Sequence, residues 1–207
     1  EAVRDVGGTV PSDKEAAYVI GMALIPALAH AAPDVPPEKY QELGNRYRLH
    51  YLQHQHDLSL FAGVLPMRND LRGRGHLLAV ATGKSRRCLD EVLHSVDLRG
   101  MFDGSRTADQ TAGKPHPLML QELMAEFDVP PERLLMIGDT THDLQMALNA
   151  GCASVGVSYG AHEPDAFHEL KPLFVAHSVA QLHGWLLEEA WAMWQRNIFL
   201  NAKGDHV

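Results

Sequence analysis

The chain has 207 residues, of which 45% are hydrophobic and 21% charged, and its formal net charge is −8. This length suits one α/β core with a smaller appended domain, and the composition is that of an ordinary globular protein. The negative charge disfavours nucleic acid, because phosphate backbones are bound by clusters of lysine and arginine. The sequence has no apolar run near the roughly eighteen residues of a membrane span, so we also expect no membrane partner.

The chain has only two cysteines, Cys88 and Cys152. This number is too small for a disulfide framework, which is typical of small proteins from oxidising compartments. We therefore expect a cytoplasmic protein.

The first 62 residues favour helices throughout. Apolar residues recur at helical spacing at Ile20, Leu24 and Leu28. A proline-rich loop at 33–37 follows, and a second helix is expected from about Glu38 to about His56. Because this segment shows no strand pattern, we predict that residues 1–62 form a small all-helical domain.

Beyond residue 62 the pattern changes to an alternation of strands and helices. Strands are expected at 77–81, 102–105, 134–138, 154–157 and 174–175, and helices at 65–72, 86–96, 117–127, 141–150 and from 179 onward. Such alternation is typical of a parallel sheet with helices on both faces. We therefore predict an α/β protein whose residues 63–187 form a Rossmann-like, doubly wound parallel sheet.

Residues 188–207 extend beyond this alternation as an extra helical tail. The tail contains the apolar stretches 190–194 and 198–200, which need a partner surface. That surface is either the protein's own core or a second subunit, so we expect a monomer or a homodimer.

The most informative segment runs from Leu134 to Asp143. Four apolar residues predict a buried strand, Gly138 and Asp139 end it, and a helix pattern follows. Asp139 is therefore expected at the carboxyl end of a strand, where open α/β sheets bind ligands. Asp143 comes one helical turn later and can face the same spot. Two carboxylates so placed suit Mg²⁺. The alternative is that one of residues 139–141 only caps the helix.

A second strand end carries Thr82 and Gly83. An apolar strand runs into Thr82, Gly83 lets backbone amides approach an anion, and the next helix presents its N-terminal N–H groups. The sequence Gly-Lys-Ser at 83–85 also occurs in P-loops, but that motif needs a glycine at position 78, which is leucine here. We therefore exclude a P-loop and keep Thr82 and Gly83 as candidates for phosphate binding.

Lys114 stands at a third junction, before a helix that Pro115 and Pro117 help to start. A lone lysine is usually a solvated surface residue, and we expect Lys114 to lie outside the core. A hydroxyl, an ammonium group and a pair of carboxylates nevertheless follow one another at successive strand–helix junctions. This order favours a phosphate site.

The order of motifs resembles the haloacid dehalogenase superfamily of phosphohydrolases, in its phosphoglycolate-phosphatase-like branch with a helical cap. The resemblance extends to about residue 187. Thr82 matches the family's phosphate-binding threonine or serine, and Lys114 matches the lysine that steadies the phosphoryl group. Asp139 and Asp143 match the acidic magnesium motif. The resemblance implies that Thr82 and Lys114 are catalytic, that they bind phosphate together with Gly83, and that Asp139 and Asp143 hold Mg²⁺ as the cofactor.

One motif of the family has no counterpart here. The family's first motif is a strand followed by Asp-x-Asp-Gly-Thr, whose first aspartate is the nucleophile. The chain opens instead with a segment that looks like the end of the first cap helix, and Asp5 has neither a preceding strand nor a second aspartate two residues later. We therefore expect about twenty residues of the family's pattern, including the first strand of the core, to be missing, and the 207-residue chain itself to be inactive.

The resemblance implies a Mg²⁺-dependent phosphatase that hydrolyses a small phosphomonoester such as phosphoglycolate. A nucleophilic aspartate attacks phosphorus, an aspartyl-phosphate forms, and water hydrolyses it. Three other functions stay open: a phosphomutase or a pyrophosphatase of the same fold, and a non-catalytic protein that keeps the scaffold and binds anions or partners. The expected partner is a small phosphorylated metabolite.

Overall fold

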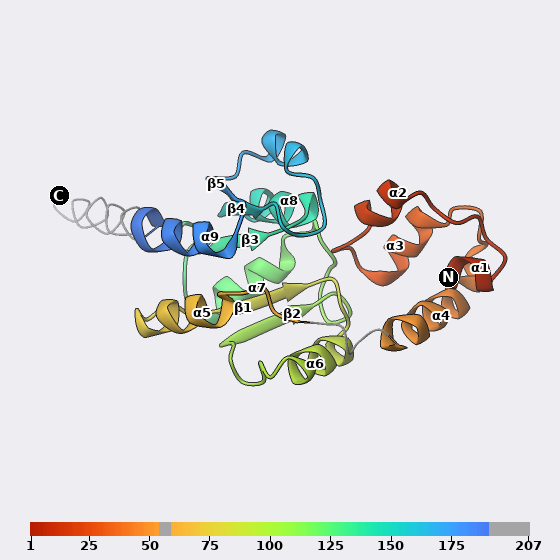
Figure 1. Cartoon of the computed structure of the whole chain (residues 1–207), viewed down its shortest axis with the longest axis horizontal. Coiled ribbons are helices and arrows are strands. Elements are labelled where there is room, and N and C mark those ends of the chain that lie inside the picture. The colour runs from red at the N-terminus through yellow and green to blue at the C-terminus, as the bar shows by residue number, and fades with distance from the viewer. Residues whose placement is uncertain (54–58, 191–207) are drawn as a thin grey trace.

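The computed structural model describes residues 1–53 and 59–190 (Figure 1). Four helices come first: α1 (Ala2–Asp5), α2 (Asp13–Tyr18), α3 (Leu24–Ala31) and α4 (Tyr40–Gln53), with a single 3₁₀ turn leading into α4. The end of the second predicted helix, near His56, lies outside the described residues. The side chains of Ser12 and Glu15 form a capping box at the start of α2, which is why this short helix begins there.

Strands and helices then alternate, as the sequence predicts. The elements are α5 (Val64–Gly73), β1 (Ala79–Thr82), α6 (Arg86–Ser95), β2 (Gly104–Thr107), α7 (Leu118–Phe127), β3 (Leu135–Gly138), α8 (Thr141–Ala150), β4 (Ala153–Val157), β5 (Phe174–Ala176) and α9 (Val179–Trp185). The predicted α/β class is confirmed. The second strand begins at Gly104, two residues later than expected, and the preceding Asp103 bonds to Leu78 through its carboxylate and its backbone N–H.

All strand pairings are parallel, but the strands form two sheets. β1 pairs with β2, where Thr82 lies opposite Thr107, and β3, β4 and β5 form the second sheet, where Gly138 lies opposite Gly156. Among the described residues, β1 and β3 each have a pairing partner on one side only. The single sheet expected from the sequence is thus divided between β1 and β3, and the backbone groups on these two edges can accept a further strand.

One hydrophobic layer joins the two sheets. The buried side chains of this layer come from α7, β3 and α8 and are Met119, Leu120, Met124, Met136, Met146 and Ala147, and Ala81 of β1 packs against them. A second layer, built from α5, β4, β5 and α9, includes Leu71, Val155 and Leu182. Helices therefore cover both faces of the strands, which is the doubly wound arrangement (Figure 1).

Three of the first four helices share a hydrophobic cluster of their own. Its buried members are Ala2, Val6, Leu28, Ala32, Val35 and Leu43. A core that α1, α3 and α4 build without residues from the sheets supports the predicted helical domain at 1–62, whose boundary stays a prediction.

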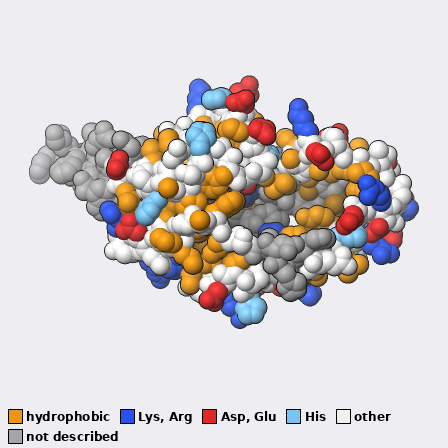
Figure 2. Space-filling model, viewed as in Figure 1, with side chains coloured by type: hydrophobic (Ala, Val, Ile, Leu, Met, Phe, Trp, Pro, Cys, Tyr) orange, Lys and Arg blue, Asp and Glu red, His pale blue; other side chains and the backbone are white. Residues whose placement is uncertain are grey.

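The surface and the C-terminal end bear on the expected partners. Figure 2 shows hydrophobic side chains gathered over the middle of one face, with acidic and basic side chains scattered around them. In the part of the chain that the structure describes, no helix is both long and apolar enough to cross a bilayer. One π-helical turn, Leu186–Ala190, follows α9. The remainder of the predicted tail lies outside the described residues.

Candidate active site

The N-terminus of α8 holds Asp143 in a fixed position. Thr140 is the N-cap residue: its hydroxyl accepts the N–H of Asp143 at 3.2 Å, and Asp143 Oδ2 accepts the backbone N–H of Thr140 at 3.2 Å and its hydroxyl at 2.7 Å. Both residues are buried. Gly138 is required here because a Cβ atom at that position would lie 2.1 Å from the Cβ of Asp143. Of residues 139–141, one of which the sequence offered as a mere helix cap, Thr140 is the residue that caps α8.

Lys114 meets Asp143 from the junction before α7. Its Nζ donates to Asp143 Oδ1 at 2.5 Å, and the two side chains are only 7% and 4% exposed. The expectation that Lys114 lies outside the core is wrong, because the loop turns its ammonium group inward onto a buried carboxylate. Separating a buried charge from its partner costs free energy, so the ion pair holds the ammonium group of Lys114 in place.

Asp139 lies at the carboxyl end of β3, half-buried. Its Oδ2 accepts the N–H of Ala161 at 2.9 Å, and its carbonyl oxygen accepts the N–H of His162 at 3.1 Å. The loop after β4 approaches so closely that a Cβ at Gly160 would lie 2.2 Å from the Cβ of Asp139. Burial, and secondly the nearby Asp139 carboxylate, raise the pKa of the Tyr159 phenol above its ordinary value. The carboxylate is thus oriented by the backbone N–H of Ala161.

Thr82 ends β1, and Gly83 begins the turn to α6. Both are half-buried, and the hydroxyl of Thr82 accepts the N–H of Lys84 at 3.2 Å, which tightens this turn. A Cβ at Gly83 would lie 2.4 Å from each of the carbonyl oxygens of Gly21 and Met22. The turn therefore faces the connection between α2 and α3.

The connection between α2 and α3 covers all three junctions that the sequence singles out. We call residues 17–23 the covering segment. Gly21 faces Thr140, and both Gly21 and Met22 face Gly83. Ala23 faces Gly113, because a Cβ atom built on Gly113 would lie 2.9 Å from the Cβ of Ala23. Thr82–Gly83, Lys114 and Asp139–Asp143 thus surround a single short stretch of backbone. The structure brings the predicted site residues together beneath it.

Replacing Gly83 with alanine is expected to push the covering segment away from the turn. The atoms in the way are backbone carbonyls, which cannot move aside as a flexible side chain can, and overpacking of this kind costs about 1–3 kcal/mol. We expect a lower melting temperature and about tenfold weaker binding of inorganic phosphate, which corresponds to about 1.4 kcal/mol.

Thermal melts and phosphate titrations of the 207-residue chain measure both effects. Gly73→Ala is the matched control, because no heavy atom lies within 4 Å of a Cβ at that position. A Gly83→Ala variant that melts and binds phosphate like the parent would refute the close approach.

Two histidines beside the site were not singled out by the sequence. His142, in the first turn of α8, and His162, in the loop after β4, are 7% and 8% exposed and contact backbone carbonyls of the covering segment. Burial lowers the pKa of His142 below its ordinary value, against the opposing effect of its hydrogen bond to Tyr18. Their partners lie more than 120 residues away in sequence, so no local pattern points to this contact.

The donor chemistry of the site fits Mg²⁺. Asp139 offers a half-exposed carboxylate at a strand end, and Mg²⁺ is commonly bound by one or two carboxylates together with waters and phosphate oxygens. Both oxygens of Asp143 already accept hydrogen bonds, from Lys114 and Thr140. Within the described residues, no group of three or more histidine, cysteine or acidic side chains is placed to hold a metal. These residues favour Asp139 as the direct ligand.

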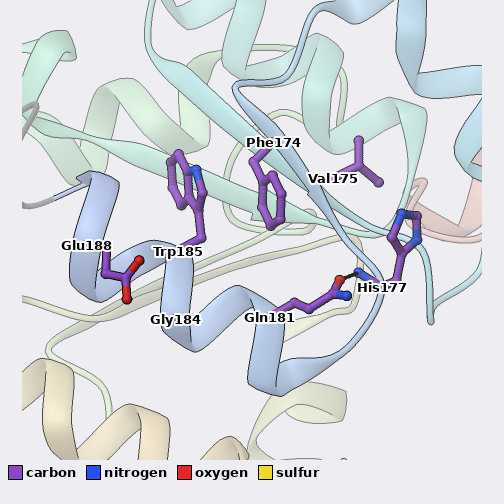
Figure 3. A pocket seen from close by; sticks show the side chains of 7 residues that line it. All are labelled: Phe174, Val175, His177, Gln181, Gly184, Trp185 and Glu188. Carbon is purple, nitrogen blue, oxygen red and sulfur yellow. Dashed lines mark hydrogen bonds between the residues drawn. The ribbon is translucent and has the colours of Figure 1, made fainter.

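A separate hollow lies on β5 and α9. Its volume is about 500 Å³, and it is lined by Phe174, Val175, His177, Gln181, Gly184, Trp185 and Glu188 (Figure 3). The rings of Phe174 and Trp185 stack with centroids 5.6 Å apart. None of the predicted site residues lines this hollow, so it belongs to another part of the surface.

Comparisons with known proteins show which family the chain resembles. The sequence model of the family described as haloacid dehalogenase-like hydrolase matches residues 1–157. The phosphoglycolate phosphatase of Vibrio vulnificus is 32% identical over 166 residues, which cover 79% of this chain and 72% of that protein. The phosphoglycolate phosphatase of Pasteurella multocida is 32% identical over 168 residues, with 79% and 74% covered.

A solved structure shares the fold. The hydrolase from Pseudomonas syringae matches with a TM-score of 0.82 at 20% sequence identity, covering 91% of this chain and 88% of that chain. At this identity the likeness concerns the fold alone. The helices and parallel strands described above therefore follow a known arrangement.

Proposed function

The chain belongs to the haloacid dehalogenase-like hydrolases, in their phosphoglycolate-phosphatase-like branch, and is a phosphoric monoester hydrolase; on this premise we propose how it acts. The proposed reaction is the Mg²⁺-dependent hydrolysis of a small phosphomonoester, phosphoglycolate or a close analogue, through an aspartyl-phosphate. The single observation that carries it is the buried Lys114–Asp143 ion pair at the N-terminus of α8, next to Asp139. Such a pair fixes a positive charge at the end of the helix that follows Asp139, the carboxylate proposed to bind the metal.

Each residue of the site has a defined task in this proposal. The ammonium group of Lys114 attracts the phosphoryl oxygens, and Asp143 holds that group in place. The hydroxyl of Thr82 and the N–H of Gly83 donate to the same oxygens at the carboxyl end of β1. Asp139 would hold Mg²⁺, which neutralises the charge that develops on the transferred group. Because these groups are already oriented, little reorganisation is needed during the reaction.

The nucleophile is proposed to come from a segment outside these 207 residues, which contain no Asp-x-Asp-Gly-Thr. The edges of β1 and β3 support this proposal, because each strand has a partner on one side only within the described residues. A parallel strand that paired with both edges would join the two sheets. Its carboxyl end would then lie between Thr82 and Asp139, which end the neighbouring strands.

The proposal is tested by supplying that segment. The test uses a fusion in which a strand followed by Asp-x-Asp-Gly-Thr precedes residue 1. We call this fusion the extended protein. The 207-residue chain is expected to release no phosphate from p-nitrophenyl phosphate or phosphoglycolate above background, and the extended protein is expected to release it with Mg²⁺. The control carries asparagine in place of the first aspartate of the added motif and should be inactive.

Two results would overturn the proposal. Mg²⁺-dependent turnover by the 207-residue chain would place the nucleophile within these 207 residues. A folded extended protein that releases phosphate from neither substrate would remove the phosphatase assignment for small phosphomonoesters. An assay that follows the transfer of phosphate between sugar positions would then separate a phosphomutase from a binding protein.

A further inference from the structure

Two buried histidines hold the covering segment by its backbone. His142 Nε2 donates to the carbonyl oxygen of Tyr18 at 2.8 Å. His162 Nε2 lies 3.1 Å from the carbonyl oxygen of Ala17 and 3.2 Å from that of Tyr18. A carbonyl oxygen can only accept, so both Nε2 atoms carry a proton. The contact therefore uses carbonyls at the end of α2, of which that of Ala17 also accepts the N–H of Ile20 at 3.1 Å.

The other ring nitrogen of His162 faces the start of α8. Its Nδ1 accepts the backbone N–H of Thr141 at 3.1 Å, and the hydroxyl of Thr141 lies 3.2 Å away. The N–H of Thr141 belongs to the first turn of α8, where helices leave donors without internal partners. One neutral imidazole, protonated at Nε2, thus satisfies both contacts and joins the end of α2 to the start of α8.

The loop of His162 also holds Asp139. The backbone N–H of His162 donates to the carbonyl oxygen of Asp139 at 3.1 Å, and the N–H of Ala161 donates to its carboxylate. The ring of Tyr18 stacks on His162 with centroids 6.0 Å apart and meets His142 edge-on at 5.1 Å. The position of the covering segment is therefore tied directly to the residues that carry the acidic motif.

We propose that His142 and His162 are positioning residues that keep the covering segment closed over the strand ends, and that they thereby determine how tightly a small phosphorylated substrate is enclosed. The proposal rests on the proposed function, because it assigns the place beneath the covering segment to that substrate. The hydrogen bonds of the histidines go to carbonyl oxygens of the covering segment, and their rings also contact the ring of Tyr18. Closure consequently depends on the two imidazole donors together with this ring contact. An enclosed site excludes water and favours substrates small enough to fit beneath the segment.

Two substitutions of His162 separate its two contacts. Asparagine keeps an oxygen near the position of Nδ1, so it retains the acceptor for Thr141 and loses the donor toward Ala17 and Tyr18. Glutamine places an amide N–H near the position of Nε2, so it retains that donor. His142→Gln likewise retains the donor toward Tyr18. His177→Asn is the matched control, because His177 is exposed and bonds to Ser158 instead.

The first measurement is amide hydrogen exchange of residues 19–22 in the 207-residue chain. His162→Asn is expected to raise their exchange rates about tenfold, the effect of losing one hydrogen bond of ordinary strength. His162→Gln, His142→Gln and the control should stay within about threefold of the parent. Melting temperatures show whether each variant is folded. In the extended protein, His162→Asn should raise KM for phosphoglycolate more than it lowers kcat, and His162→Gln should restore KM.

The outcomes distinguish this inference from the proposed function. Unchanged exchange in His162→Asn would overturn the inference, whatever the extended protein catalyses. Equal effects of His162→Asn and His162→Gln would show that the imidazole acts by packing and would also overturn it. If exchange responds as expected and the extended protein is folded but inactive, the histidines hold the covering segment and the proposed function fails alone.

Discussion

Asp139→Asn in the extended protein is expected to lower Mg²⁺-dependent phosphate release by about 10³-fold, the upper end of the range for one preorganised electrostatic group. Asparagine keeps an oxygen that can accept the N–H of Ala161, but it lacks the negative charge that attracts the metal. Because Asp139 is half-buried and has backbone donors around it, the variant should melt near the temperature of the parent.

The check combines steady-state kinetics over a range of Mg²⁺ concentrations with calorimetric titration of Mg²⁺ into the 207-residue chain. Asp165→Asn is the control, because it removes one carboxylate from an exposed position on the loop between β4 and β5. Activity and Mg²⁺ binding equal to the parent's in Asp139→Asn would show that this carboxylate is not the ligand.

Lys114→Ala is expected to lower kcat by ~10²–10³-fold, the range for removal of one preorganised donor. Thr82→Ala should cost less, because a neutral hydrogen bond is roughly half as strong as a charge-assisted one. The two variants should also differ in stability. Removing Lys114 leaves Asp143 buried without its counter-charge, and breaking a buried pair in this way costs about 3–5 kcal/mol. Thr82→Ala breaks no ion pair and should melt near the parent.

Kinetics and melts of a double variant separate chemistry from folding. Lys114→Ala combined with Asp143→Asn removes the uncompensated charge, so we expect much of the lost stability to return while activity stays low. Lys114→Arg should restore activity only in part, because a planar guanidinium does not replace a compact ammonium group. If activity returned together with stability in the double variant, Lys114 would be a structural residue and not a phosphate ligand.

Local sequence pattern was sufficient for the elements and for the positions of the site residues along them. Thr82, Gly83 and Asp139 each lie where an apolar strand is followed by a turn and a helix. The strand and the start of the helix both fall within about ten residues of sequence. Side-chain alternation and helix start signals act over the same distance, so the order of strands and helices and the α/β class followed from them. The pattern placed the start of β2 two residues too early.

The tertiary structure alone decided how those positions act together. Lys114 and Asp143 are 29 residues apart, and only the packing of α7 against α8 turns the lysine from a presumed surface residue into half of a buried ion pair. His162 and Ala17 are 145 residues apart, and their bond involves a backbone carbonyl that any residue would provide. The division of the sheet between β1 and β3 depends on which strands pair. Sequence periodicity records which face of an element is buried, but not which distant element buries it.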